Sequence, residues 1–394
     1  MITHQAALPE QAFESFEFRG TAREYFNIWI VNLLLTIVTL GIYSAWAKVR
    51  TLKYFYGNTF VGGHNFDYHA DPRKILKGRM IAVSVLFGFG FLSSLLPGAE
   101  FWVLAAWLTL LPMLIVMATS FHLRNSSYRN IRFNFIRDYV GAYRLFGWPL
   151  LFAVTLTGLA LHAPSVVHWL ETSQHQGQGP APTVKDLLLP IFSLALIPLA
   201  PYLDYARARF LVDRASYGHY QAHLNCGAWA FYKLYLVTFL FFVAIFAVLG
   251  LGVGLISTVF GIGRGGAGPL DFKAIAPFAV TAVIVFYSAA FFVGGYFRAQ
   301  RTNLVYGHAD FAGHRLRSEL TGRSVGWLYL SNTVAAILSL GLMLPWARVR
   351  MARYVAERTA LQTTGLEDVR AVDGTAGSVV GEEVMDVFDV DLGL

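Results

Sequence analysis

Residues 231–257 read FYKLYLVTFLFFVAIFAVLGLGVGLIS, and Lys233 is the only charged residue among them. This run is longer than the ~20 apolar residues that a helix needs to cross the hydrocarbon core of a bilayer. Further apolar segments recur along the chain, with approximate bounds 25–46, 80–97, 101–121, 142–162, 186–205, 274–297 and 325–346. Together these segments predict an all-α integral membrane protein, a polytopic helical bundle with about eight apolar segments.

The composition excludes most other classes of protein. Of the 394 residues, 56% are hydrophobic and only 14% are charged, whereas an average globular chain carries about 25% charged residues. The single cysteine, Cys226, excludes an internal disulfide and a thiolate metal cluster. No set of catalytic residues, metal ligands or cofactor-binding residues is recognisable in the sequence, which favours a non-enzymatic protein without a cofactor.

Positive charge gathers in certain connections between the apolar segments. Of the 31 Lys and Arg residues, 25 lie in the connections 47–79, 120–144, 203–233, 297–324 and 347–359. The connections 98–100, 163–185 and 258–273 contain only three basic residues, Lys185, Arg264 and Lys273. The positive-inside rule therefore places the first set in the cytoplasm and the second set outside. Basic residues beside apolar segments also favour anionic lipid headgroups, rather than nucleic acid, as partners.

The first and last apolar segments do not both fit this pattern as single crossings. If 325–346 crosses the membrane, Arg348, Arg350 and Arg353 emerge on the outside. If the chain instead turns back at 39–41 and at 339–341, these arginines and both termini stay in the cytoplasm. We prefer cytoplasmic termini, and the alternative of full crossings stays open at this point.

One motif occurs twice with identical spacing. The first copy contains Asn32, Leu40-Gly41, Trp46-Ala47-Lys48-Val49-Arg50, Lys53-Tyr54 and Thr59. The second copy contains Asn332, Leu340-Gly341, Trp346-Ala347-Arg348-Val349-Arg350, Arg353-Tyr354 and Thr359. Weaker copies begin at Tyr205 and Tyr296. A fixed spacing of this kind predicts internal repeats.

The basic and aromatic side chains of the repeats are the candidate ligand-binding residues. Arginine and lysine near a helix end reach phosphate oxygens while their stems lie along apolar surface, and Trp and Tyr rings favour the headgroup level. The candidates are Trp46, Lys48, Arg50, Tyr54, Arg207, Arg209, Arg298, Arg301, Trp346, Arg348, Arg350 and Tyr354. They form either a basic vestibule for an anionic headgroup or solute, or ordinary interfacial anchors.

Asn32 and Asn332 are polar residues inside the two terminal apolar segments, at equivalent positions of the repeat. A polar side chain at membrane depth is costly and often functional. The two asparagines either form interhelical hydrogen bonds that fix packing or line a polar cavity.

The charge pattern divides the chain into an N-terminal segment (1–24), a repeated transmembrane helical domain (25–361) and an acidic tail (362–394). The tail has a net charge of −7, and the rest of the chain has +14. In the tail, Val384, Val387 and Phe388 have the spacing of a helical apolar stripe. We expect the tail to dock onto the basic connections, with plain disorder as the alternative.

The stretch from Glu24 to Asn32, the stretch from Thr39 to Arg50 and the sequence Tyr54-Phe55-Tyr56-Gly57-Asn58-Thr59 resemble the YjgN-like family of bacterial inner-membrane proteins. The last residues, 382–394, are also similar to the end of that family. The resemblance implies an inner-membrane location and a polytopic helical fold, and it implies no catalytic residues because the family has no assigned function.

These observations favour binding or translocation of an anionic or amphipathic molecule, such as a lipid. The alternative is a membrane scaffold whose repeats bind lipid headgroups or a partner protein. A scaffold predicts dry packing between the apolar segments, whereas transport predicts a continuous polar cavity.

Overall fold

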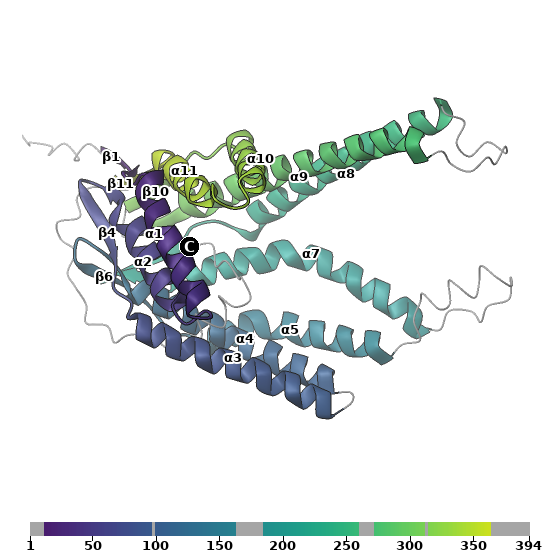
Figure 1. Ribbon diagram of the computed structural model, residues 1–394. Coiled ribbons are helices and arrows are strands. Elements are labelled where there is room, and N and C mark those ends of the chain that lie inside the picture. Colours follow the sequence, from purple (N-terminus) through teal and green to yellow (C-terminus); the bar gives the residue numbers. More distant parts are fainter. Residues whose placement is uncertain (1–11, 97–98, 163–183, 260–271, 312–313, 364–394) are drawn as a thin grey trace, which may run out of the picture. The chain divides into compact units, whose positions relative to one another are not determined.

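The computed structural model describes residues 12–96, 99–162, 184–259, 272–311 and 314–363 (Figure 1). The chain divides into two compact units. The first unit contains residues 1–27, 226–309 and 314–364, and the second contains residues 28–225 and 310–313. The acidic tail from residue 364 and its predicted docking lie outside the described residues, as do most of the connections 163–185 and 258–273, which are predicted to face outward.

In the second unit, helices alternate with pairs of short strands. The helices are α2 (Ser44–Gly57), α3 (Pro72–Leu95), α4 (Ala99–Arg124), α5 (Tyr139–His162) and α7 (Val184–Asp213), and most of α1 (Ala22–Val38) also belongs here. The strands are β3 (Thr59–Val61), β4 (His64–Tyr68), β5 (Ser126–Tyr128), β6 (Ile131–Phe135), β7 (Ala215–Tyr217) and β8 (Tyr220–Leu224). Strands β3 to β8 pair in sequence order, and every pair is antiparallel.

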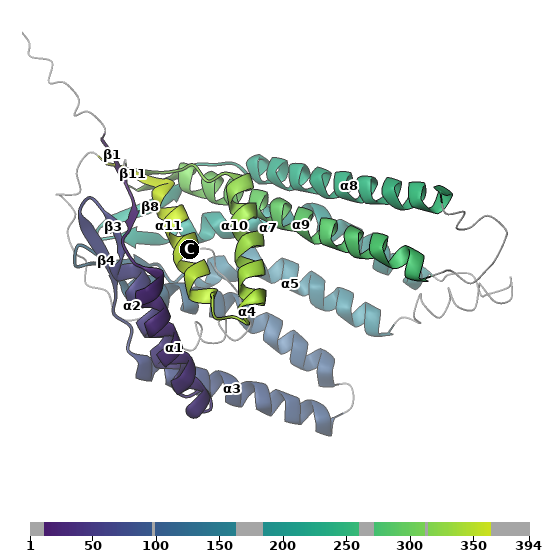
Figure 2. The ribbon, with the colours of Figure 1, turned by 45° about the horizontal axis from the view of Figure 1, so that its top comes forward.

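The first unit contains two helical pairs and three strands that pair with one another. Its helices are α8 (Ala228–Val259), α9 (Phe272–His308), α10 (Gly322–Leu338) and α11 (Leu344–Glu357). Its strands β1 (Ala12–Ser15), β11 (Thr359–Thr363) and β10 (His314–Ser318) pair antiparallel in that order. Strand β2 (Glu17–Phe18) follows β1, and β9 (Ala309–Phe311) follows α9. Helices α8 and α9 lie side by side in the ribbon (Figure 1), as do α10 and α11 (Figure 2).

The predicted all-α fold is wrong, because four of the five basic connections contain two β-strands each, and the fifth ends where β11 begins. The longer strands alternate apolar and polar residues, and in three of the pairs the described strands are joined by two-residue turns, a pattern of hairpins rather than helices. At two of these turns both residues have positive φ: Gly62 and Gly63 at 55° and 75°, and Arg129 and Asn130 at 49° and 63°. These angles suit the turns that match the twist of paired strands.

The expected number of apolar spans is also wrong. Within the described residues, the helical stretches long and apolar enough to cross a membrane are Pro72–Leu92, Ala105–Arg124, Ala228–Gly252 and Val280–His308. The two terminal segments, 25–46 and 325–346, are each divided between two helices by a turn. Many side chains of the segments 142–162 and 186–205 lie outside the described residues.

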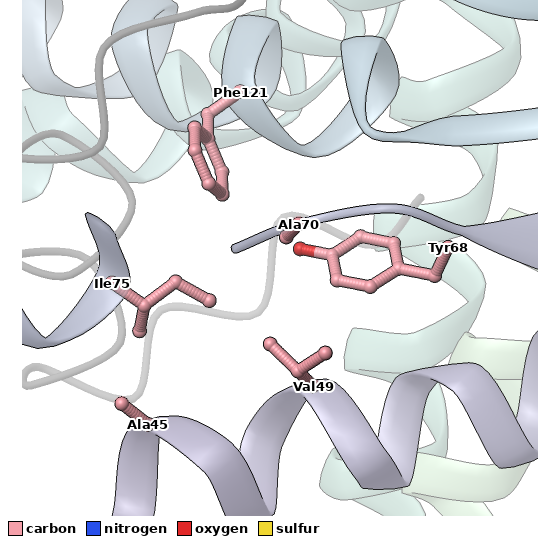
Figure 3. Packing of buried hydrophobic residues seen from close by; sticks show 6 residues of the cluster. All are labelled: Ala45, Val49, Tyr68, Ala70, Ile75 and Phe121. Carbon is pink, nitrogen blue, oxygen red and sulfur yellow. The ribbon is translucent and has the colours of Figure 1, made fainter. Parts of the chain in front are cut away.

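A hydrophobic cluster anchors the helices of the second unit to the hairpin that joins them (Figure 3). Its buried members come from α2, β4, the connection after β4, α3 and α4: Ala45, Val49, Tyr68, Ala70, Ile75 and Phe121. Asp71 caps α3 by accepting a hydrogen bond from the backbone N–H of Arg73, and Pro72 takes the first helical position. The start of α3 is therefore fixed by local sequence at the place where it meets this cluster.

In the first unit, close approach of glycines sets the packing of α9 against α10. A β-carbon added to Gly295 of α9 would lie 2.3 Å from the backbone nitrogen of Gly326 in α10. Gly322 and Gly326 stand four residues apart on α10, the spacing that lets helix backbones approach closely in membranes. The close packing of these two helices therefore depends on the absence of side chains.

Candidate functional site

The α10–α11 hairpin turns back through a left-handed bend. Leu340 and Gly341 have φ values of 51° and 89°. The N–H of Gly341 donates to the carbonyl of Ala336 at 2.7 Å, and the N–H of Leu340 donates to Ile337 at 3.1 Å, the pattern of a Schellman-type helix end. Helix α11 therefore runs back along α10 instead of continuing in its direction.

A polar cluster joins the two helices of this hairpin. Asn332 Nδ2 donates to the carbonyl of Ala347 at 3.4 Å, and its Oδ1 accepts from Arg350 Nη1 at 3.1 Å. Arg350 Nη1 also donates to Ser331 Oγ at 2.7 Å. The guanidinium of Arg350 lies over the ring of Trp346, 5.0 Å from its centroid, which is a cation–π geometry. The structure thus gives Asn332 an interhelical hydrogen bond and holds Arg350 in one orientation.

The α1–α2 hairpin of the second unit repeats this geometry. Asn32, which is buried, donates from Nδ2 to the carbonyl of Ala47 at 3.4 Å and accepts from Arg50 Nη1 at 3.3 Å. Arg50 Nη1 also donates to Tyr43 Oη at 2.9 Å. At its turn, Leu40 and Gly41 have φ values of 50° and 92°. The shared sequence motif therefore produces a shared local structure.

The α10–α11 hairpin borders a groove of about 1020 Å³ in the first unit. Three arginines line it, Arg323 from α10 and Arg350 and Arg353 from α11, together with one acid, Glu357. Its other lining residues are Thr21, Ala22, Phe292, Ser324, Trp327, Leu328, Trp346, Val349 and Tyr354. Of the predicted candidates, the structure therefore brings Trp346, Arg350 and Tyr354 into one site.

The hydroxyl of Tyr354 sits in a hydrogen-bonded position at the edge of this groove. It accepts from the backbone N–H of Thr321 at 3.1 Å and lies 3.3 Å from Thr321 Oγ1. Burial acts to raise the pKa of Tyr354, but the hydrogen bonds from Thr321 and Ser324 and the charge of Arg358 outweigh it and lower that pKa. Donors and cations thus converge on this edge of the groove, an environment that stabilises negative charge.

An apolar groove of about 590 Å³ continues along α10. Trp327 lines both grooves, and Ser331, which bonds Arg350, lines the apolar one. The other residues of the apolar groove are Leu330, Val334, Ala335, Leu338, Ser339 and Met343. A cationic groove and an apolar groove therefore meet at Trp327 on one helix.

The other candidates have different places. Arg348 donates to the hydroxyl of the fully buried Tyr25 at 3.1 Å, which makes it a packing residue. Arg298 and Arg301 lie on α9 but do not line the groove. In the second unit, Arg209 bonds Asp213 at 3.2 Å and Tyr205 at 2.9 Å.

The remaining candidates, which also lie in the second unit, are Trp46, Lys48 and Tyr54 of α2 and Arg207 of α7. Trp46 stacks on Tyr43, with 6.1 Å between their ring centroids, and packs against the hydrophobic cluster of Figure 3. Lys48, Tyr54 and Arg207 are each half-buried.

Sequence reasoning missed Arg323 and Trp327, which the groove contains. A signal was present, because Arg323, Trp327, Leu330, Val334 and Leu338 recur at intervals of three or four residues. Such spacing puts them on one face of a helix. Arg353 belonged to the repeated motif but was not among the candidate residues.

Comparison with known proteins relates the chain to a bacterial family. The chain matches the family of bacterial proteins of unknown function (DUF898) over residues 13–387. It is 27% identical over 241 residues to inner membrane protein YjgN of Escherichia coli O157:H7. The aligned region covers 60% of this chain and 58% of that relative. It is 23% identical over 362 residues to inner membrane protein YjgN of Salmonella typhimurium strain LT2. This alignment covers 88% of this chain and 87% of that relative.

A third relative, inner membrane protein YjgN of Escherichia coli strain K12, is 34% identical over 147 residues, or 36% of each chain. The aligned regions thus span only part of the two Escherichia coli relatives. No solved structure matches this chain. The match of the family model over most of the length shows that this chain belongs to the DUF898 family, whose relatives include the YjgN inner membrane proteins.

Proposed function

We propose that this inner-membrane protein binds an anionic amphipathic molecule of the phospholipid class in the joined grooves of α10 and α11, and that it acts without catalysis. The observation that carries this proposal is the meeting of the two grooves at Trp327. A cationic site for a headgroup next to an apolar face for an acyl chain has the two-part chemistry of such a ligand.

The charges of the larger groove favour an anion. Its lining carries three guanidinium groups against the single carboxylate of Glu357. Arg353 Nη2 donates to the carbonyl of Gly20 at 3.0 Å, which leaves its other N–H groups available. Arg323 is exposed and forms no hydrogen bond or ion pair with any described residue. A guanidinium binds phosphate through two parallel hydrogen bonds, so Arg323 and Arg353 suit a phosphodiester.

Replacement of Arg323 by glutamine is the direct test. We expect at least about tenfold weaker retention of phosphatidylglycerol, because one charge-assisted hydrogen bond is worth roughly 1.5–3 kcal/mol and about 1.4 kcal/mol is tenfold in affinity. The measurement is native mass spectrometry of protein extracted in mild detergent and titrated with that lipid. The matched control is Arg317→Gln, which removes an exposed arginine of β10 that pairs with Glu319 outside the groove.

Equal lipid retention by Arg323→Gln, Arg317→Gln and the unaltered protein would reject the groove as the headgroup site. Lipid retention by none of the three would favour the scaffold alternative, in which the repeats bind a partner protein. The difference between the two variants is also expected to shrink as salt rises, because exposed charges are screened within about 8 Å at physiological ionic strength.

The proposal includes a membrane topology in which the basic connections and both termini are cytoplasmic and the α1–α2 and α10–α11 hairpins are internal repeats. It rests on the distribution of Lys and Arg and on the shared hydrogen bonds of Asn32 and Asn332. The two turn geometries agree in both φ values to within a few degrees, which supports a common repeat unit.

Cysteine labelling tests this topology. In a Cys226→Ser background, Asn65→Cys and Glu319→Cys are expected to react with a membrane-impermeant maleimide only after the cells are permeabilised. Gln176→Cys, in a connection that carries few basic residues, is expected to react in intact cells. Strong labelling of Asn65→Cys or Glu319→Cys in intact cells would reverse the proposed orientation.

A further inference from the structure

We infer that the turns of the α1–α2 and α10–α11 hairpins insert into the hydrocarbon of the membrane without crossing it. Each turn enters only one leaflet and returns to the side from which it came. The residues at and before the turns are apolar and unusually exposed. Leu40 and Leu340 are each 94% exposed, and Val38 and Leu338 are 77% and 81% exposed. A cluster of bare leucine and valine side chains at a loop tip marks an interaction site when it faces water.

The backbone N–H groups of each turn are hydrogen-bonded within the turn, as an environment without water requires. In the first turn, the N–H groups of Leu40, Gly41 and Ile42 donate to the carbonyls of Ile37, Thr36 and Thr39 at 2.8–3.1 Å. In the second turn the corresponding N–H groups make the same bonds at 2.7–3.1 Å. An unsatisfied backbone N–H group finds no water to bind in hydrocarbon and is costly there, so a turn at membrane depth must satisfy its own donors.

The polar side chains of these turns are also satisfied internally. Thr36 and Thr39 donate their hydroxyls to the carbonyls of Asn32 and Leu35 at 2.6 and 2.7 Å. Thr39 Oγ1 accepts from the N–H of Tyr43 at 2.9 Å, and Ser339 Oγ accepts from the N–H of Met343 at 3.0 Å. The outward surface of each turn is consequently apolar, although its sequence contains hydroxyl residues.

The leucine at each turn also favours insertion into hydrocarbon. Leu40 and Leu340 adopt the left-handed conformation, which is strained for an L-residue and is usually adopted by glycine or asparagine. An exposed leucine in water offers nothing in return for this strain. Burial of a leucine side chain in hydrocarbon is favourable by an amount comparable to this strain and therefore offsets it.

The depth of insertion follows from the helix geometry. From Trp327 to Leu338 a helix rises roughly 17 Å, and from Trp29 to Val38 roughly 14 Å. Each value is close to half of the ~30 Å hydrocarbon thickness. The bonds of Arg50 to Asn32 and of Arg350 to Asn332 show that each second helix returns alongside the first. A single crossing by either terminal segment does not agree with this return.

Site-directed spin labelling tests the inference independently of lipid binding in the groove. Leu40→Cys and Leu340→Cys, each in a Cys226→Ser background, are labelled with a nitroxide and reconstituted into vesicles of phosphatidylcholine and phosphatidylglycerol. We expect both labels to collide more often with oxygen than with a water-soluble nickel complex, and to lie near the middle of the bilayer. The controls Asp67→Cys and Glu319→Cys, at exposed hairpin positions, are expected to show the opposite preference.

Two results would overturn the inference. Greater access to the nickel complex at Leu40→Cys and Leu340→Cys would place the turns in water, and low access to both reagents would place them against protein. Ile37→Cys and Ile337→Cys, three residues earlier and also exposed, repeat the measurement if either tip variant fails to fold. Failure of lipid retention at Arg323 leaves the expected spin-label result unchanged, because Leu40 and Leu340 line neither groove.

Discussion

Gly295→Ala is expected to prevent folding of the first unit, which makes it the most damaging small substitution in the described part of the chain. The added β-carbon would lie 2.3 Å and 2.5 Å from the backbone nitrogen and α-carbon of Gly326, and 3.0 Å from the carbonyl oxygen of Gly322. Overpacking a core costs about 1–3 kcal/mol where side chains can shift. Here the obstacle is the backbone of α10, so α9 and α10 must separate.

The adjacent glycine supplies the control for this prediction. A β-carbon added to Gly294 would meet nothing within 4 Å, so Gly294→Ala is expected to leave stability unchanged or slightly improved, as alanine favours a helix. The measurement is the yield of monodisperse protein in mild detergent together with its thermal unfolding midpoint. Similar behaviour of the two variants would show that α9 and α10 do not pack through their glycines.

The strands were not predicted, although the sequence contains the alternation that indicates them. The charge of a connection indicates the side of the membrane on which it lies, whereas the alternation of its residues indicates strands. In β6, Ile131, Phe133 and Phe135 alternate with polar residues, directly after the Arg129-Asn130 turn. This is the pattern of a half-buried strand. A strand of three to five residues is too short to be distinguished by hydropathy averaged over a membrane-length window.

The candidate site was predictable in part, because the repeat placed its aromatic and basic residues at fixed spacing. Trp346, Arg350 and Tyr354 lie in the groove as a consequence of their spacing on α11. The same spacing put Arg348 among the candidates, although its side chain turns to Tyr25. Which face of a short helix meets the rest of the protein depends on tertiary contacts, and no single-sequence period reveals them. The helical spacing of Arg323 puts it on one face with Trp327, but Arg323 joins the site only when α10 folds against α11.

Phe121→Ala is expected to lower the free energy of unfolding by about 3–5 kcal/mol, a large share of the ~5–15 kcal/mol that stabilises a typical protein. Phe121 is 1% exposed and packs in the cluster with Tyr68 and Ile75 (Figure 3). Its removal would leave a cavity among α2, α3, α4 and β4, where four elements meet. Equilibrium unfolding in mixed micelles with increasing dodecyl sulfate measures the change.

Phe87→Ala is the matched control, because sequence alone gives no reason to separate the two phenylalanines. Both lie in helical stretches apolar enough to cross a membrane, but Phe87 is 76% exposed on α3. A surface substitution of this kind changes stability by roughly 0.5 kcal/mol or less. The large difference expected between the two variants arises because Phe121 lies where the helices join the β-hairpin, whereas Phe87 faces outward from the helix. An equal loss of stability in both variants would contradict this packing and require that α3 bury the face that carries Phe87.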